Sequence, residues 1–397
     1  MSTESTFRGV QPGGTIGMLG GGQLGRLFAM AAAELGYRVV VFSPQSDCPA
    51  GEVAYHTIVG ELTDHERLDE FAACCDVVTL EFENLPVDMV SYLASKVAVY
   101  PSPNVLRIAQ DRRLEKQTFA DHGIPVTPFR VVNNHDDLRN AAQELGLPLV
   151  LKTARDGYDG KGQWKIGEDE AKPLESYVID RPMIAEAWIR YQRELSVLIA
   201  RSHDGETATY PIFENEHRNH ILDVTRCPAN VSDKTLQEAT QLAIAAANAI
   251  GLLGLMCVEL FHGEDGRLMI NEVAPRPHNS GHLTIEACHT SQFEQHVRVV
   301  CGLPLGDTSL REPFAAMANI MGDLWSNGEP AWSNAISMPG VHLHLYGKRH
   351  AAIGRKMGHI TMTGNEPQHV LSRLHAARQS LRANLSANPS DFGHAVE

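Results

Sequence analysis

The sequence predicts a protein of three folded units that mixes the α/β and α+β classes, and three observations carry this prediction. At 397 residues the chain is longer than a single hydrophobic core usually sustains. In its first part, apolar runs alternate with amphipathic segments, which is typical of a parallel sheet with crossover helices. Later runs come in close pairs, which favours antiparallel strands. We expect the units to span residues 1–110, 111–305 and 306–397.

The first unit is expected to hold the parallel sheet. Its apolar runs TIGML, RVVVF and VVTLEF alternate with helix-like segments at 23–35 and 64–74. This order predicts strands joined by helices. The first dozen residues carry no such pattern, and we expect them to be disordered.

The second unit is expected to be α+β, with mostly antiparallel strands. It begins with a helix at 111–122 and the strand LPLVLK, and continues with the runs MIAEAWI and ELSVLIA. An alanine-rich helix at 233–250 and the pair MCVELF and LMINEV follow. The pieces AAMANIMG, VHLHLYG and GHITMTG, with a helix ending near 384, then predict a small closing domain and a frayed tail.

Composition limits the classes of partner. The formal net charge of −14 argues against a general binder of nucleic acid or of anionic membranes. No apolar run is long enough to span a bilayer, and residues 1–12 contain no signal-peptide core. The seven cysteines lack the spacing of a metal site, and Cys74 and Cys75 fall in a segment that reads as buried, which suits a reducing compartment. We therefore expect a cytoplasmic protein.

The stretch GMLGGGQLG raises the question of a dinucleotide site, because Gly20, Gly22 and Gly25 match G-x-G-x-x-G. A glycine turn before a helix lets backbone N–H groups approach a phosphate. The second strand, however, runs into Ser43 and Pro44 instead of the acid that binds ribose hydroxyls in NAD sites. From the glycines alone, a phosphate site and a tight packing turn are equally good interpretations.

Two acids follow the third apolar run of the first unit. Glu81 and Glu83 fall at the end of a strand, where ligands bind in open parallel sheets. One interpretation is a polar small molecule held between these acids and the glycine turn, and the other is a pair of solvated charges. The sequence does not decide which of the two acids would face a ligand.

The strongest signal from the residues alone is MCVELFHGEDGRLMINEV, which predicts a hairpin. A two-residue turn at Asp265 and Gly266 places Glu259 directly opposite Glu272. Their Cβ atoms would lie about 5 Å apart, where two carboxylates repel each other unless a cation lies between them. Two oxygen ligands suit Mg²⁺ better than zinc or iron. A turn shifted by one residue would instead send one glutamate to solvent.

A lysine and a glycine-rich loop suggest a phosphate site nearby. Lys152 ends the strand LPLVLK just before RDGYDGKGQ, which contains three glycines and Lys161. We interpret residues 155–163 as a flexible flap over phosphates, with a fixed cation beneath it. No Ser or Thr follows Lys161, so the loop is not a P-loop. An exposed hairpin tip is the alternative.

These features occur in the order found in ATP-grasp enzymes, and the chain resembles one family of them. The strings GGGQLG, EFEN, YDGKGQ, NEVAPRPHNSGHLT, YGK and GRKMGHI resemble N5-carboxyaminoimidazole ribonucleotide synthetases over residues 14–380. The resemblance implies an ATP-grasp fold with an N-terminal Rossmann-like (pre-ATP-grasp) domain and a small C-terminal domain. It also implies a ligase of purine biosynthesis that uses ATP and bicarbonate to convert 5-aminoimidazole ribonucleotide into N5-carboxyaminoimidazole ribonucleotide through carboxyphosphate.

The resemblance further implies the roles of individual residues. ATP would be bound by Arg112, Lys152, Gly157, Tyr158, Asp159, Gly160, Lys161, Gly162, Gln163, Glu186, Ala187, Trp188, Ile189, Glu194, His217, Asn271 and Glu272. Mg²⁺, for which Mn²⁺ could substitute, would be held by Glu259 and Glu272. Catalysis on bicarbonate would involve Arg276, His278, Asn279, Ser280, the Gly281 backbone and Asp159. The ribonucleotide would be bound by Gly22, Gln23, Leu24, Glu83, Tyr158, Lys348 and Arg355.

Some features leave alternatives open. Asp156 stands where the family usually has glycine, which would stiffen the flap or add a negative charge. His278 and His282 are four residues apart like helical zinc ligands, but Pro277 and Gly281 disfavour a helix there. A formate-dependent glycinamide ribonucleotide transformylase and a catalytically silent ATP-binding regulator are the rival functions. The resemblance implies small-molecule partners and a homodimer.

Overall fold

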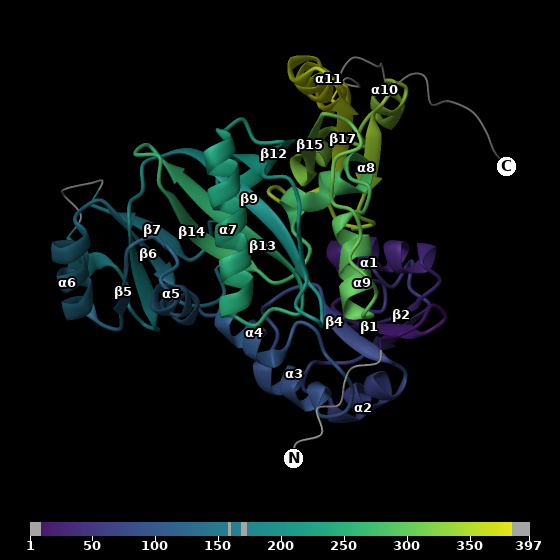
Figure 1. The fold of residues 1–397 in the computed structure, drawn as a ribbon, viewed down its shortest axis with the longest axis horizontal. Helices are drawn as coiled ribbons and strands as arrows, with labels where there is room; N and C mark the ends of the chain where they lie inside the picture. The colour runs from purple at the N-terminus through teal and green to yellow at the C-terminus, as the bar shows by residue number, and fades with distance from the viewer. Residues whose placement is uncertain (1–8, 158–159, 168–172, 383–397) are drawn as a thin grey trace.

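The computed structural model describes residues 9–157, 160–167 and 173–382. Figure 1 shows a small sheet with a covering helix at one side of the molecule, a large sheet with a long helix across its middle, and the first unit below. The C-terminal strands and helix lie above the first unit. No helix in the described ranges is long and apolar enough to cross a membrane.

The first unit is the predicted parallel sheet, with strand order β3-β2-β1-β4. The strands β1 and β4 are fully buried because helices cover both faces, which is why they read as uninterrupted apolar runs. Its elements are β1 (Thr15–Leu19), α1 (Gln23–Glu34), β2 (Arg38–Ser43), β3 (His56–Val59), α2 (His65–Ala73), β4 (Val77–Leu80), α3 (Val87–Ala94) and α4 (Pro103–Ala109).

One expectation about this unit is wrong. Cys74 is exposed and Cys75 is only half-buried, because Cys74 caps the C-terminus of α2 and the chain turns there toward β4. The other five cysteines are buried thiols, and all seven are free.

A small antiparallel sheet opens the second unit, with strand order β5-β8-β6-β7. The helix α6 packs on it through Leu138 and Ala141, which form a core with Leu149, Leu151 and Ile166. Its elements are α5 (Arg112–Asp121), β5 (Phe129–Val132), α6 (His135–Leu145), β6 (Leu149–Thr153), β7 (Gln163–Ile166), η1 (Leu174–Ser176) and β8 (Met183–Ala187).

A large sheet occupies the centre of the molecule, with the order β14-β13-β9-β11-β12-β15-β17-β16, and β10 pairs with β9. All of its pairings are antiparallel, as the paired apolar runs predicted. Its second-unit elements are β9 (Tyr191–Arg201), β10 (Thr207–Thr209), β11 (Phe213–Arg218), β12 (Ile221–Cys227), α7 (Asp233–Ala249), β13 (Gly254–Gly263), β14 (Leu268–Ala274), η2 (Asn279–Leu283), α8 (Thr284–Ala287) and α9 (Gln292–Val300).

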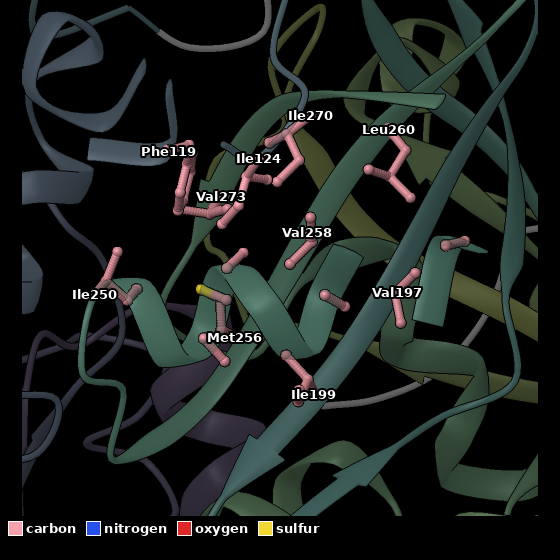
Figure 2. Packing of buried hydrophobic residues seen from close by; sticks show 14 of the residues in the cluster. Phe119, Ile124, Val197, Ile199, Ile250, Met256, Val258, Leu260, Ile270 and Val273 are labelled. Carbon is pink, nitrogen blue, oxygen red and sulfur yellow. The ribbon is translucent and has the colours of Figure 1, made fainter. Parts of the chain in front are cut away.

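The two faces of this sheet have different roles. On one face Val197, Ile199 and Val258 point toward α7, as Figure 2 shows, and the small side chains of Ala243 and Ala246 let the helix lie close. Since side chains alternate along a strand, the residues between these apolar positions on β9 face the other way. That second face carries the cleft described below.

The third unit continues the large sheet. Strand β15 pairs with β12, with Val224 opposite Ala318, so no gap in the sheet marks residue 305. Residues of both units share one apolar core, which includes Leu198 and Met317. Its elements are β15 (Phe314–Met321), η3 (Gly322–Asn327), α10 (Trp332–Ile336), β16 (His342–Leu345), β17 (Lys356–Gly364) and α11 (Pro367–Ser380).

Candidate active site

A cleft of about 980 Å³ is lined by residues from all three units. Gln23 comes from the first unit, Lys152 and Glu272 come from the second, and Lys356 comes from the third. The predicted site residues on its wall are Gln23, Leu24, Glu83, Arg112, Lys152, Gly157, Gly160, Lys161, Gln163, Glu186, Ala187, Trp188, Ile189, Glu194, His217, Glu259, Asn271, Glu272, Arg276, His278 and Asn279.

The remaining predicted residues lie elsewhere. Tyr158 and Asp159 lie outside the described residues. Gly162 lines a smaller cavity on the other side of the strands β6 and β7. The wall of the cleft does not include Gly22, Ser280, Gly281, Lys348 or Arg355.

A buried charge cluster closes one end of the cleft. The Lys152 ammonium lies 3.0 Å from Oε2 of Glu186, and the Lys116 ammonium lies 3.6 Å from the same atom. Burial alone would raise the pKa of Glu186, but the two lysines lower it to about 2. Lys116 also donates to the Thr127 hydroxyl and to the Ile270 carbonyl oxygen. The cluster therefore presents Lys152 to the cleft as a fixed cation.

Aromatic side chains line the next part of the wall. The Lys165 ammonium lies 3.9 Å from the ring centroid of Trp188, and Tyr191 stacks on Phe261 with centroids 4.8 Å apart. Sequence reasoning missed Lys165, Tyr191 and Phe261. Period-two alternation could have placed Lys165 on the same side of β7 as Gln163, but it gives no sign that this side faces a ligand.

Strand pairing positions His217. Asn215 on β11 is opposite Glu194 on β9, and His217 follows two residues later on the same face of β11. The β-bulge beside it lies on β12, where Asp223 is the extra residue between the partners of Glu216 and His217. As a result the His217 imidazole reaches Oε2 of Glu194 on the neighbouring strand β9. That carboxylate raises the pKa of His217 above its ordinary value, although burial opposes the shift.

The predicted hairpin forms, but not with the predicted turn. Glu259 lies opposite Glu272, as expected. The turn is nevertheless one residue longer than a two-residue turn, because Gly263 N–H donates to the Arg267 carbonyl oxygen and the ladder begins with His262 opposite Leu268. A bulge beyond Leu260 then restores the pairing of the two glutamates.

This bulge also explains how two adjacent residues face the same site. Asn271 is the extra residue of β14, so Asn271 and Glu272 both line the cleft instead of pointing to opposite faces. Oδ1 of Asn271 is buried and has no hydrogen-bond partner in the described part of the chain. An unsatisfied oxygen beside two carboxylates is a favourable arrangement for a cation.

Protein cations already balance the hairpin carboxylates. The Arg112 guanidinium lies 3.1 Å from Glu272, and Nε2 of His278 lies 3.1 Å from Glu259. The expected need for a cation beside the pair is therefore met by protein side chains here, and a metal ion at the pair stays a prediction. Burial alone would lower the pKa of His278, but the neighbouring Cys257 and Glu259 raise it to about 10. The described residues contain no group of three or more His, Cys, Asp or Glu side chains arranged to hold a metal.

Arg276 and Glu83 join the first unit to the second. Nε and Nη2 of Arg276 donate to the two Glu83 carboxylate oxygens at 2.5 and 2.8 Å. Burial alone would raise the pKa of Glu83, but Arg276 lowers it. Since Arg276 and Glu83 both line the cleft, this pair lies where the predicted bicarbonate and ribonucleotide sites would meet.

The loop after Arg276 places its residues at two depths. His278 and Asn279 line the cleft, whereas Ser280 and Gly281 lie beneath them. Nδ1 of His278 lies 2.8 Å from the Ser280 hydroxyl oxygen, and the Gly281 N–H donates to the His278 carbonyl oxygen. Ser280 and Gly281 therefore act on the cleft wall through their neighbours.

The glycine turn binds an anion that belongs to the protein itself. Oε2 of Glu81 accepts from the Gly25 N–H at 2.7 Å, and Oε1 accepts from the Gly22 N–H. A Cβ atom on Gly22 would lie 2.8 Å from this carboxylate, so glycine is needed for the close approach. Glu81 thus occupies the N-terminus of α1, and Glu83 is the acid that faces the cleft.

The predicted cations of the third unit, Lys348 and Arg355, do not line the cleft in the described structure, and their role in substrate binding stays a prediction. The Lys348 ammonium donates to Gln23 Oε1 at 2.5 Å and to the Lys356 carbonyl oxygen at 2.7 Å. Arg355 is exposed and donates to the His350 carbonyl oxygen. Lys356, which sequence reasoning missed, lines the cleft. Adjacent residues of a strand point in opposite directions, so once Arg355 points away from the cleft, Lys356 is expected to point toward it.

Asp156 adopts a backbone conformation that suits glycine. Its φ is 65°, in the left-handed region where a side chain is usually unfavourable and where aspartate is among the better tolerated residues. An aspartate at this position therefore has a conformational cost that glycine would not have.

Comparisons with known proteins agree with this geometry. A ribonucleotide synthetase preATP-grasp domain model matches residues 14–110, an ATP-grasp domain model matches 117–293, and a phosphoribosylaminoimidazole carboxylase C-terminal domain model matches 315–373. The N5-carboxyaminoimidazole ribonucleotide synthase of Bacillus subtilis is 42% identical over 89% of this chain and 92% of its own length. A bifunctional purine synthesis protein of Dictyostelium discoideum is 44% identical, and the match spans 37% of that protein.

Two solved structures are similar over nearly the whole chain. One is an ADP complex of an N5-carboxyaminoimidazole ribonucleotide synthetase, with a TM-score of 0.87, 39% identity, and coverage of 93% of this chain and 97% of that one. The other is the enzyme of Aspergillus clavatus with ADP and 5-aminoimidazole ribonucleotide, with a TM-score of 0.84, 33% identity, and coverage of 93% and 98%.

Proposed function

The chain belongs to the N5-carboxyaminoimidazole ribonucleotide synthase family, and from this membership we propose that it is the ATP-dependent ligase that carboxylates 5-aminoimidazole ribonucleotide in purine biosynthesis. The observation that carries the proposal is the convergence in one cleft of Lys152, the carboxylates of Glu259 and Glu272, and the Arg276–Glu83 pair. Lys152 is a cation that can bind phosphate oxygens, and the two carboxylates offer the oxygen ligands that a metal ion prefers. Arg276 can donate hydrogen bonds to an anion beside the proposed substrate site.

The reaction then follows in three steps. A bicarbonate oxygen attacks the γ-phosphorus of ATP, the bond to the β-phosphate oxygen breaks, and ADP leaves. The carboxyphosphate so formed loses phosphate to give CO₂, which the exocyclic amine of the ribonucleotide attacks. The released phosphate can take the amine proton, so the chemistry requires no dedicated base from the protein.

Each group of residues has a physical role in these steps. Lys152 and Arg112 neutralise phosphate oxygens, and the backbone of 186–189 offers hydrogen bonds to the adenine. Arg276, with its planar fork of donors, would bind bicarbonate once Glu83 turns to the substrate amine. The flap over residues 155–163 would exclude water, because water would hydrolyse carboxyphosphate. The ribonucleotide phosphate would meet the cations of the third unit.

The hairpin fits Mg²⁺, and Mn²⁺ would be accepted for the same reason. Glu259 and Glu272 offer two carboxylates, and the unpartnered Oδ1 of Asn271 adds a third oxygen donor. When bound, the metal ion would neutralise phosphate charge during phosphoryl transfer. Arg112 would then turn from Glu272 toward anionic substrate groups.

The test is ADP release with Mg²⁺, ATP and bicarbonate, in the presence of either 5-aminoimidazole ribonucleotide or glycinamide ribonucleotide with formate. We expect stimulation only by the aminoimidazole compound together with bicarbonate. Stimulation by the glycinamide pair would replace the proposal with a transformylase. ADP release under none of these conditions would favour an ATP-binding regulator.

The family resemblance also supports a cytoplasmic homodimer. Light scattering should then give twice the chain mass of 43.5 kDa. A mass equal to one chain at micromolar concentration would contradict the dimer.

A further inference from the structure

We propose that Ser196, Asn215 and Thr225 are positioning residues for the bicarbonate step, which they serve by holding Ser280 and, through it, His278. The inference rests on the proposed function, because it assigns these residues to one substrate of that reaction. None of the three lines the cleft, so they would act only through the chain of hydrogen bonds that joins them to His278.

The chain of hydrogen bonds is continuous. The Thr225 hydroxyl donates to Oδ1 of Asn215 at 3.0 Å, and Nδ2 of Asn215 donates to the Ser196 hydroxyl oxygen at 2.9 Å. Ser196 donates to the Ser280 hydroxyl oxygen at 3.0 Å, and that oxygen lies 2.8 Å from Nδ1 of His278. The other ring nitrogen of His278 faces Glu259 in the cleft. This relay of hydrogen bonds, which runs from Thr225 through Asn215, Ser196 and Ser280 to His278, therefore ends on a group that touches the proposed site.

The fold places these residues side by side. Thr225 and Asn215 are register partners on β12 and β11, and Ser196 on β9 is opposite Glu259 on β13. Ser196 lies between Leu195 and Val197, which pack under α7, so its own side chain points to the cleft face of the sheet. The relay thus runs across neighbouring strands beneath the loop that carries Ser280.

The four hydrogen-bonded polar residues are unusual for the interior of a sheet because they are buried. Thr225, Ser196 and Ser280 are completely buried, and Asn215 is 7% exposed. A buried polar side chain left without a partner costs about 1–3 kcal/mol, so apolar residues would be the simpler choice for packing alone. None of the four has an unpartnered side-chain atom, whereas both amide atoms of Asn279 on the cleft wall are unpartnered among the described residues. The four buried polar residues are satisfied by one another and by His278, and the amide of Asn279 is left for a ligand.

The direction of donation points toward the site. A hydroxyl has one hydrogen, so once Thr225 donates to Asn215, each following member donates onward to the next. The Ser280 hydroxyl then meets His278 and can donate to a neutral ring or accept from a protonated one by rotating. In both protonation states the ring plane stays fixed and Nε2 remains directed into the cleft. A shift of about 1 Å in such a group can change a rate by roughly 100-fold.

The experiment measures ADP release by the full chain while bicarbonate and ATP are varied separately. We expect Ser196→Ala to raise the KM for bicarbonate roughly tenfold and Thr225→Val, at the far end, to raise it by about threefold. The KM for ATP should change by less than about twofold, because the hydrogen bonds end on His278, which is assigned to bicarbonate, and Lys152 and Glu186 on the small sheet are untouched. Thr361→Val is the matched control, since Thr361 is a buried threonine of the same sheet whose hydroxyl has no partner among the described residues.

A double-mutant cycle separates positioning from general stability. In a His278→Asn background, Ser196→Ala should add little further loss, because the group that the relay positions is gone. The inference would be overturned if the losses were additive or if the KM values for bicarbonate and ATP rose equally. It would also be overturned if Thr361→Val had an effect as large as that of Thr225→Val. If the wild-type chain is active and the variants have unchanged kinetics, this inference is overturned and the proposed function is not. A wild-type chain without bicarbonate-dependent ADP release would overturn the proposed function and this inference together.

Discussion

Lys348 and Lys356 lie eight residues apart and are joined by a hydrogen bond from the Lys348 ammonium to the Lys356 carbonyl oxygen. Lys356 lines the cleft, whereas Lys348 holds Gln23 of the first unit. The two cations therefore contribute in different ways. Lys356 can meet a substrate phosphate directly, and Lys348 keeps the strand start and the glycine turn together.

Lys356→Ala should raise the KM for the ribonucleotide roughly tenfold or more with little change in the KM for ATP, because it removes a charge-assisted contact. Lys348→Ala should also raise that KM, and the effect should be the smaller of the two if its role is to position Gln23. Arg349→Ala is the control, since Arg349 is 60% exposed and pairs with Asp47. Steady-state kinetics with varied ribonucleotide would measure all three, and an unchanged KM for Lys356→Ala would remove it from the site.

Glu272→Gln should abolish ATP turnover at limiting Mg²⁺ and lower metal affinity by roughly 100-fold, since even residues behind a metal ligand change affinity by 10–100-fold when mutated. Excess Mg²⁺ should restore part of the activity. Glu264→Gln in the same hairpin is exposed and should behave like the wild type. Near-normal turnover by Glu272→Gln at limiting Mg²⁺ would contradict the metal site.

At the scale of elements, buried histidines hold helices to strands. Nε2 of His296 on α9 lies 2.8 Å from the Thr79 hydroxyl on β4, and the His296 ring packs edge-on against Phe28 of α1. Burial lowers the pKa of His296 to about 3 and lowers the pKa values of His282 and His359 well below their ordinary value. These rings must stay neutral for the elements to remain packed.

The stability of the protein should therefore fall in mild acid. The unfolded state of His296 binds a proton below about pH 6.5, while the folded state does so only near pH 3. Between these values the unfolded state holds more protons, so the free energy of unfolding falls by about 1.4 kcal/mol per pH unit for this group as the pH decreases. His296→Gln should lower that slope by about 1.4 kcal/mol per pH unit, which corresponds to one proton, in denaturant titrations between pH 4 and pH 6. An unchanged slope would contradict the prediction, and His65→Gln, an exposed residue, is the control.

The sequence predicts most elements here, and its errors arise where a local irregularity decides the geometry. Apolar periodicity locates β1, β2, α1 and α7 to within a residue or two, because burial alone controls those patterns. The hairpin turn is wrong by one residue, and only the bulge at Asn271 brings Glu259 and Glu272 together again. A bulge is set by tertiary packing, so alternation along the strand gives no signal for it.

At the scale of the whole molecule, contacts between the units matter more than the boundaries along the chain. The large sheet runs from β14 in the second unit to β16 in the third without interruption. Phe293, Val297 and Tyr346 belong to the same apolar core as Phe28 of the first unit. Sequence patterns describe each element separately, so they could not show that the third unit shares its core and its sheet with the second. The cleft depends on this arrangement, since its wall is built from all three units.

This sharing predicts that the three units unfold together in one calorimetric transition, with equal calorimetric and van't Hoff enthalpies. Met317 on β15 is completely buried in the core that joins the second and third units. Met317→Ala should therefore cost about 2–5 kcal/mol and lower the Tm of the whole transition by roughly 3–5 °C, without splitting it. Met30→Ala is the control, because Met30 is 45% exposed on α1. If Met317→Ala moved only a separate low-temperature transition, the third unit would fold independently, and the cleft would then be closed by docking of a domain instead of by a continuous sheet.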